Sequence, residues 1–220
     1  MCSARKRNFS AGTASSARRF PLGTGLAFAN KYRGDSSVTM TYFGDGASNQ
    51  GQVYEAFNMA ELWKLPVVYI IENNQYAMGT SVERSSAQVD FSKRGSSFNI
   101  PGRQVDGMDV EAVHQAGREA IDWCRAGNGP IILEMKTYRY RGHSMSDPAK
   151  YRTREEVHAV REKRDPIEHL GQKLVVEKLA TEDELKAMDK DIRQIVNHAA
   201  EFATESPEPD AAELYTDVLA

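Results

Sequence analysis

Residues 37–74 read SVTMTYFGDGASNQGQVYEAFNMAELWKLPVVYIIENN, and this stretch decides the fold class. Residues 37–43 are mostly β-branched or aromatic and stop at a glycine, a pattern that predicts a strand. Residues 66–72 are almost continuously apolar, as in a parallel sheet that is covered on both faces. The segment between them, residues 49–62, has an amphipathic helical pattern with one apolar face: Val53, Phe57 and Ala60. Strand, helix and strand in succession predict a right-handed βαβ unit.

Helical and strand patterns continue on both sides of this unit. Residues 22–32 predict a helix, because apolar side chains recur there at helical spacing: Leu22, Leu26, Ala27, Ala29 and Tyr32. Gly23 and Gly25 in that helix allow another backbone to approach closely. Asp109 is a candidate N-cap for a helix that ends near Gly127. Its expected inward side chains are Val110, Val113, Ala116, Ala120, Ile121 and Cys124.

The remaining segments complete the predicted organisation. Residues 130–137 predict a third strand. Residues 73–109 predict a long loop, functional or disordered, with no strong period except in the short stretch 98–101. Helices are expected over residues 153–164, around Leu174, and from Thr181 onward, where Glu184 completes a capping box. The expected fold class is therefore α/β, a parallel sheet flanked by helices on both faces. We expect a basic segment (1–20), an α/β domain (21–150) and a helical region (151–220).

Composition excludes several classes of protein. The chain has 220 residues, 40% of them hydrophobic, and a formal net charge of −3, so nothing global favours nucleic acid or an anionic membrane as partner. No apolar run approaches the roughly 20 residues that span a bilayer. The two cysteines, Cys2 and Cys124, lie far apart and indicate neither a disulfide scaffold nor a zinc site. A reducing compartment fits this cysteine usage best.

Polar residues follow two neighbouring predicted strands. Asp45, within Gly44-Asp45-Gly46, comes directly after the first strand, and Asn74 follows the second. Ligands of open α/β sheets bind at this carboxyl edge. Mg²⁺ prefers oxygen ligands and takes one or two carboxylates, so the Asp45 carboxylate, the Asn74 amide and a backbone carbonyl at residues 75–76 form a suitable set. Gly46 leaves room for a diphosphate, and the helix that opens near Asn49 directs free N–H groups toward negative charge.

The spacing of these motifs resembles a known family. Gly-Asp-Gly is followed, after 26 intervening residues, by Asn-Asn, which is similar to the thiamine diphosphate fingerprint. The surrounding sequence resembles the E1 alpha subunits of 2-oxo acid dehydrogenases, and among them those of pyruvate dehydrogenase. The resemblance continues through FNIPGRQVDGMDV and GPIILEMKTYRYRGHSMSDPAKYRTREE, and it covers about residue 21 to the C-terminus.

This resemblance implies thiamine diphosphate and Mg²⁺ as cofactors and assigns residues to them. Asp45, Asn74 and the Tyr76 carbonyl are the implied Mg²⁺ ligands. Gly46 and Ala47 are the implied neighbours of the diphosphate. The implied reaction is oxidative decarboxylation of pyruvate, followed by transfer of the acetyl group to a lipoyl group.

The resemblance also implies a catalytic residue and partner proteins. His143, in Arg141-Gly142-His143-Ser144, matches the active-site loop histidine, which contacts the cofactor and assists acyl transfer, and Arg139 holds that loop. The implied partners are an E1 beta subunit in an alpha2beta2 heterotetramer, whose glutamate activates the cofactor, and a lipoyl-bearing E2 acyltransferase. The implied location is the bacterial cytoplasm, or the mitochondrial matrix in a eukaryote.

The first twenty residues depart from the family pattern. They are basic and rich in serine, and residues 14–17 read ASSA where the family carries a glycine-rich stretch that holds the aminopyrimidine ring. A transit peptide has a similar composition, but residues 8–9 and Gly12 still align with the family. We therefore expect a truncated or divergent alpha subunit that has little or no decarboxylase activity alone.

Two alternative functions remain open at this point. One is a branched-chain 2-oxo acid or acetoin dehydrogenase, although the loop GHSMSDP favours pyruvate. The other is a non-catalytic remnant that acts as an interaction subunit. A nucleic-acid module is disfavoured, because no aromatic or groove-reading pattern accompanies the basic residues.

Overall fold

The computed structural model describes residues 19–216. The chain divides into two compact units, Met1–Pro166 and Ile167–Ala220, and each is described by itself. The divergent segment expected over residues 1–20 lies almost entirely outside the described residues. The domain boundaries expected at residues 20 and 150 stay a prediction.

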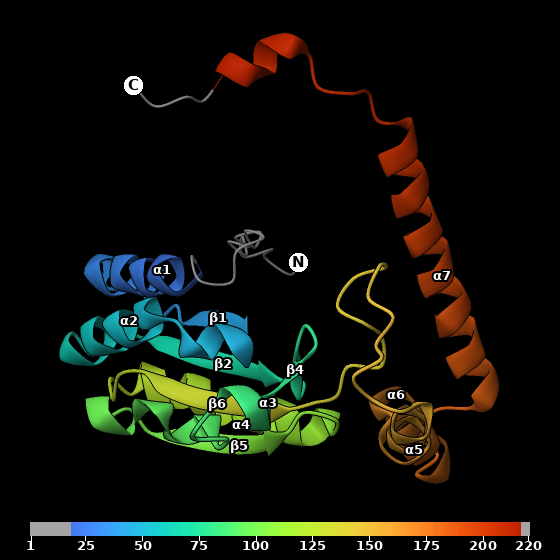
Figure 1. The fold of residues 1–220 in the computed structure, drawn as a ribbon, viewed down its shortest axis with the longest axis horizontal. Coiled ribbons are helices and arrows are strands. Elements are labelled where there is room, and N and C mark those ends of the chain that lie inside the picture. The colour runs from blue at the N-terminus through green and yellow to red at the C-terminus, as the bar shows by residue number, and fades with distance from the viewer. Residues whose placement is uncertain (1–18, 217–220) are drawn as a thin grey trace. The chain divides into compact units, whose positions relative to one another are not determined.

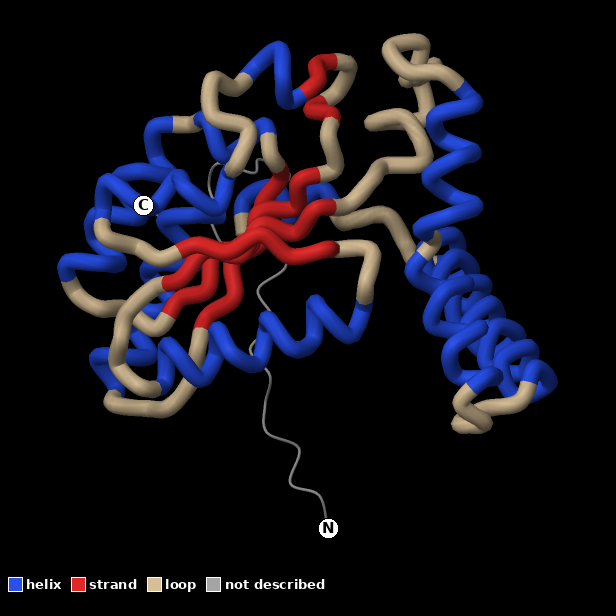
Figure 2. Tube along the Cα trace, turned by 90° about the horizontal axis from the view of Figure 1, so that it is seen from below, coloured by secondary structure: helices blue, strands red, loops and turns tan. Residues whose placement is uncertain are grey.

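The first unit is built on a four-stranded parallel sheet with strand order β1-β2-β6-β5 (Figures 1 and 2). The strands are β1 (Thr39–Gly44), β2 (Val67–Asn73), β5 (Gly102–Asp106) and β6 (Ile131–Lys136). In the central strand β2 six of seven residues are buried, as its apolar sequence predicts. The expected α/β fold with a parallel sheet is thereby confirmed.

Helices cover both faces of this sheet (Figure 1). On one face, α1 (Arg19–Arg33) and α2 (Gly51–Leu62) enclose a core with alternate residues of β2, including Val67, Tyr69 and Ile71. On the other face, α4 (Val110–Arg125) packs on Val68 and Ile70. Successive side chains of a strand point to opposite faces, so β2 supplies both cores.

The helix α4 begins where its N-cap predicts. The Asp109 carboxylate accepts hydrogen bonds from the Glu111 and Ala112 N–H groups, at 2.9 and 3.1 Å. Its buried residues are Ala116, Ala120 and Cys124, as expected, and Gly127 adopts a φ of 81° just after its end. The expected inward orientation of Val110 is wrong, since this side chain, in the first turn, is exposed.

The helix α1 forms as expected but turns a different face to the sheet. Leu22, Leu26 and Tyr32 are exposed, and the buried side chains are Phe20, Thr24 and Ala27. A Cβ at Gly23 would lie 2.0 Å from the Thr41 Oγ1 of β1, so the glycine face makes the closest approach. The fit of the helix backbone against the Thr41 side chain, more than the leucine spacing, therefore determines the orientation of this helix, and the group that approaches Gly23 is a side chain and not the expected backbone. A Cβ at Gly25 would meet nothing, so the close approach expected there is wrong.

The expectation of an unstructured loop over residues 73–109 is also wrong. This segment contains a two-stranded hairpin, two short helices and the edge strand β5. The short elements are β3 (Tyr76–Ala77), β4 (Thr80–Ser81), α3 (Val82–Ser85) and η3 (Phe91–Phe98). Because Val105 is the only buried residue of β5, the strand carries no alternating apolar pattern.

Helices dominate the end of the chain. The first unit includes α5 (Arg154–Arg164) and ends at the first residue of α6 (Pro166–Val176). The second contains the rest of α6, α7 (Glu182–Glu205) and η4 (Ala211–Tyr215). The capping box expected at Thr181 and Glu184 is present. Within residues 19–216, no helix is both long enough and apolar enough to cross a bilayer.

Candidate diphosphate and metal site

The sheet brings the two polar motifs to the same edge. Gly44, the last residue of β1, lies opposite Glu72 of β2 in the parallel register. Asp45 therefore leaves the sheet beside Asn73 and Asn74, as the sequence predicts. The loop after β6, which contains Arg139 and His143, leaves the sheet from the same edge.

Asp45 places a buried carboxylate at this edge. The residue is 4% exposed, and its side chain caps none of the N–H groups of the short helix η2 (Gly46–Asn49) that follows. Burial raises the pKa of the Asp45 carboxyl, opposed by its own backbone N–H, the Arg139 charge and the Asn74 backbone N–H. A cation bound here would favour the carboxylate form.

Gly46 lies against the β3–β4 hairpin, and Ala47 follows it in η2. A Cβ at Gly46 would approach the Ala77 Cβ to 2.7 Å, so only glycine fits without moving the hairpin. Ala47 is buried within η2. The helix α2 begins at Gly51, two residues after the expected start at Asn49. That these residues adjoin a diphosphate stays a prediction.

The turn after β2 brings two further groups together. One end of the Asn74 amide lies 2.8 Å from the Tyr76 carbonyl oxygen, and its other end lies 3.1 Å from the Arg139 Nη2. With its oxygen toward Tyr76, the amide accepts a hydrogen bond from the Tyr76 N–H at 3.3 Å. With its nitrogen there, it donates to the Tyr76 carbonyl instead. The first orientation also sets the Asn74 amide nitrogen against the Arg139 Nη2, another donor, so the second satisfies both ends of the amide within the protein, and only a bound cation would select the first.

This spacing suits an octahedral cation. Ligand bonds of 2.0–2.1 Å at right angles separate neighbouring oxygens by about 2.9 Å, close to the 2.8 Å between the Asn74 amide and the Tyr76 carbonyl oxygen. Within the described part of the chain, no three His, Cys, Asp or Glu side chains gather in a group that could hold a metal. The expected set differs from such a group, because it contains a single carboxylate and leaves positions for phosphate oxygens and water.

Arg139 connects this edge to the loop that carries His143. Its Nη1 lies 3.2 Å from the His143 Nδ1, while its Nη2 faces Asn74. Arginine can only donate, so the His143 Nδ1 accepts and the neutral ring carries its proton on Nε2. The structure thus brings His143 and Asn74 to opposite ends of one guanidinium group.

Two residues that the sequence analysis did not single out hold the His143 loop. The Asp147 carboxylate accepts hydrogen bonds from the His143 N–H at 2.7 Å and the Tyr151 hydroxyl at 2.9 Å. Arg152 donates to the Arg139 carbonyl, and its guanidinium carbon lies within 6 Å of three tyrosine ring centroids: 5.9 Å from Tyr76, 5.3 Å from Tyr138 and 5.8 Å from Tyr151. The alternation of Tyr and Arg over residues 138–141 marks the tyrosine rings of this loop, but it includes neither Asp147 nor Arg152.

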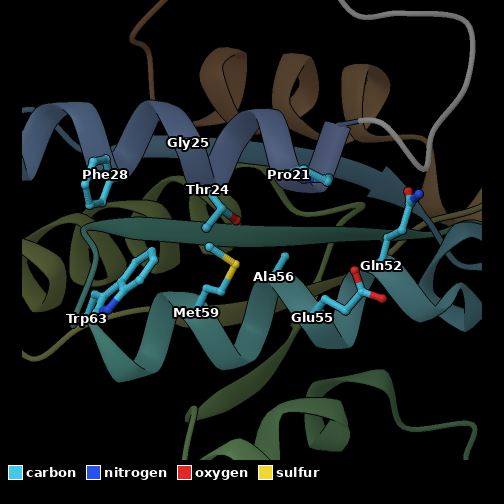
Figure 3. A pocket seen from close by; sticks show the side chains of 9 residues that line it. All are labelled: Pro21, Thr24, Gly25, Phe28, Gln52, Glu55, Ala56, Met59 and Trp63. Carbon is cyan, nitrogen blue, oxygen red and sulfur yellow. The ribbon is translucent and has the colours of Figure 1, made fainter.

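A groove of about 370 Å³ lies elsewhere, between α1 and α2 (Figure 3). Phe28, Met59 and Trp63 provide much of its apolar wall, while Gln52 and Glu55 lie toward one end. None of the candidate site residues lines it. The groove is therefore separate from the strand-end site.

Sequence comparisons agree with this arrangement. The family described as "Dehydrogenase E1 component" has a sequence model that matches residues 1–212. The chain belongs to this dehydrogenase E1 family. Three relatives are each named as a pyruvate dehydrogenase E1 component subunit alpha. The protein of Rhizobium meliloti is 67% identical over 90% of this chain and 57% of its own length. That of Zymomonas mobilis is 59% identical over 90% and 56%.

The third relative, a mitochondrial protein of Dictyostelium discoideum, is 55% identical over 96% of this chain and 56% of its own length. The chain thus spans a little over half the length of these dehydrogenase E1 relatives. The resemblance drawn from GDG, NN and the His143 loop is confirmed at the level of the family. The relatives come from bacteria and from a mitochondrion, so the family itself is not restricted to one compartment.

Proposed function

We propose that this chain supplies the Mg²⁺–diphosphate half of a thiamine diphosphate site in a pyruvate dehydrogenase E1 alpha subunit. The observation that carries the proposal is the pairing of the Asn74 amide with the Tyr76 carbonyl oxygen, 2.8 Å apart, beside the buried Asp45 carboxylate. The names of the relatives support a pyruvate dehydrogenase. The sequence resemblance implies the finer reaction, oxidative decarboxylation of pyruvate with acetyl transfer to a lipoyl group.

The donor set fits the proposed cofactors. Asp45, Asn74 and the Tyr76 carbonyl would hold Mg²⁺, and the backbone at Gly46 and Ala47 would face the diphosphate. When bound, thiamine diphosphate supplies the thiazolium carbon that attacks the 2-oxo group and the ring that accepts the electrons. The residues of this chain contribute position and charge.

His143 is the proposed catalytic residue. Since Arg139 engages its Nδ1, the Nε2–H of the neutral ring is the group that can donate a proton toward the reacting atoms. The proposed role is contact with the cofactor and assistance to acyl transfer. Asp147 and Arg152 position the loop that presents this ring.

The proposed partners follow from the subunit names of the relatives and from the sequence resemblance. An E1 beta subunit, in an alpha2beta2 assembly, would supply the glutamate that activates the cofactor, and a lipoyl-bearing E2 acyltransferase would receive the acetyl group. The chain is therefore expected to have little or no activity without the beta subunit.

Reconstitution tests this proposal. The full chain, alone and coexpressed with the beta subunit of its own complex, is assayed for decarboxylation of pyruvate and of 2-oxoisovalerate with an artificial electron acceptor. We expect activity on pyruvate for the coexpressed pair only, and its loss in His143→Ala but not in His114→Ala, an exposed histidine of α4. Preference for 2-oxoisovalerate would assign a branched-chain substrate, and an inactive pair would favour an interaction subunit.

A further inference from the structure

A carboxylate is buried in the middle of the sheet. Glu134 lies in the central part of β6 and is 0% exposed. Its neighbours along the strand are Leu133 and Met135, which belong to the apolar core beneath α4. Burial of an acidic group in such surroundings is costly unless hydrogen bonds satisfy it. The contacts of Glu134 therefore call for an explanation.

Three donors satisfy the Glu134 carboxylate. The Asn73 Nδ2 donates to its Oε1 at 2.7 Å. The Ser92 N–H and the Gln104 Nε2 donate to its Oε2 at 3.1 and 2.9 Å. An ionised carboxylate accepts only, so it complements this ring of donors, whereas an amide of the same shape must turn one N–H toward another donor.

Asn73 transmits this constraint to the turn after β2. The residue is 1% exposed, and because its Nδ2 is committed to Glu134, its Oδ1 faces the Gln75 N–H and accepts a hydrogen bond from it at 3.2 Å. Gln75 has a φ of 76°, a left-handed conformation that is uncommon for residues other than glycine. The Asn73 side chain thus stabilises a backbone conformation that the residue type does not favour.

The turn in question places the proposed Mg²⁺ ligands. Gln75 separates Asn74 from Tyr76, and its left-handed φ brings the Asn74 amide to within 2.8 Å of the Tyr76 carbonyl oxygen. An extended residue at this position would carry the two ligands apart. Glu134 therefore holds the Asn73 amide, Asn73 holds the backbone at Gln75, and this turn sets the distance between the two proposed ligands.

We propose that Glu134 is a positioning residue for the cation site, because its carboxylate fixes the Asn73 amide and so holds the turn that pairs Asn74 with Tyr76. This inference rests on the proposed function, since the occupant of the site is the Mg²⁺ of the diphosphate cofactor. Glu134 touches neither cofactor nor substrate in this scheme. Removing a residue that orients metal ligands without touching the metal typically changes metal affinity by about 10–100-fold.

The test compares Glu134→Gln with a matched control in the complete complex. Glu134→Gln keeps the shape of the side chain but forces a conflict with either Asn73 or Ser92. Gln104→Ala removes a donor to the same carboxylate from β5 and leaves the Asn73 bond intact. Calorimetric titration with Mg²⁺ at saturating thiamine diphosphate is expected to show affinity at least about tenfold weaker for Glu134→Gln and unchanged for Gln104→Ala.

A double variant separates positioning from loss of folding. In Glu134→Gln with Asn73→Asp, the new amide donates to the new carboxylate, so the hydrogen bond between residues 73 and 134 is restored with reversed polarity. The bonds donated by the Ser92 N–H, the Gln104 Nε2 and the Gln75 N–H keep their direction. We expect this variant to recover Mg²⁺ affinity. In the cofactor-free complex, hydrogen exchange of residues 73–77 is expected to accelerate in Glu134→Gln and to return to the wild-type rate in the double variant.

The outcomes distinguish the two proposals. A wild-type complex that binds no Mg²⁺ with thiamine diphosphate overturns the proposed function, and this inference with it. A wild-type complex that binds both, with equal affinity in Glu134→Gln or equal loss in Gln104→Ala, overturns this inference alone. If Glu134→Gln does not fold, a folded double variant that fails to recover affinity has the same consequence.

Discussion

The contact between Gly46 and the β3–β4 hairpin yields a prediction with a magnitude. In Gly46→Ala the new Cβ would lie 2.7 Å from the Ala77 Cβ, whereas two carbon atoms need about 3.5–4.0 Å. The hairpin must therefore move by about 1 Å, and Tyr76 moves with it. The substitution is expected to weaken both the fold and the proposed cation site.

Overpacking of this kind costs about 1–3 kcal/mol, which for a chain of this size lowers the melting temperature by about 2–12 °C. The companion change Ala77→Gly removes the opposing methyl group, and the nearest atom is then the Ala77 Cα at 4.0 Å. The double variant should regain the loss to within the ~0.5–1 kcal/mol that an added strand glycine costs.

Thermal melts of the complex, followed by circular dichroism, measure these shifts. Gly117→Ala serves as the control, because a Cβ at this α4 position meets nothing within 4 Å, and helix propensity predicts a gain of up to about 1 kcal/mol. A wild-type melting temperature for Gly46→Ala, or a double variant no more stable than the single one, would refute the proposed contact.

Two further predictions concern titrating groups. Burial raises the pKa of the Cys124 thiol to about 12, so in a Cys2→Ser background at pH 8 a disulfide reagent should label the chain only after urea is added, and immediate labelling would contradict this. The His143 N–H and other donors of its loop hold the pKa of Asp147 below its ordinary value, so the loop order that it contributes is present above about pH 4 and is lost as the pH falls through the lowered pKa. A fluorophore on Met145→Cys should show reduced anisotropy in Asp147→Asn at pH 7 and in the parent only in acid, and equal anisotropy of both at pH 7 would count against this role of the carboxylate.

Elements with strong local signals could be predicted from the sequence. The apolar run of β2, the Asp109 cap of α4 and the Thr181 capping box each occur where expected. These features depend on neighbouring residues, so a short stretch of sequence contains the whole cause. The shared strand edge of Asp45 and Asn74 also follows from a single βαβ unit.

Features that depend on distant partners could not be predicted. β5 pairs with β6 along one edge and buries only Val105, so its sequence resembles a loop. The bond between Glu134 and Asn73 joins residues 61 positions apart, and no local pattern marks it. The buried face of α1 is determined by the fit of Gly23 against Thr41, which hydrophobic periodicity does not measure.

Calorimetry of the complete complex tests the central claim most directly. Wild type, Asp45→Asn and Asp122→Asn, an exposed control on α4, are titrated with thiamine diphosphate in the presence and absence of Mg²⁺. The account predicts Mg²⁺-dependent binding of thiamine diphosphate by wild type and by Asp122→Asn. In Asp45→Asn the apparent Mg²⁺ affinity is expected to fall by more than about a hundredfold, a larger loss than removal of a residue that only orients the ligands causes. Equal affinity for thiamine diphosphate with and without Mg²⁺, or an Asp45→Asn complex with wild-type Mg²⁺ affinity, would contradict it.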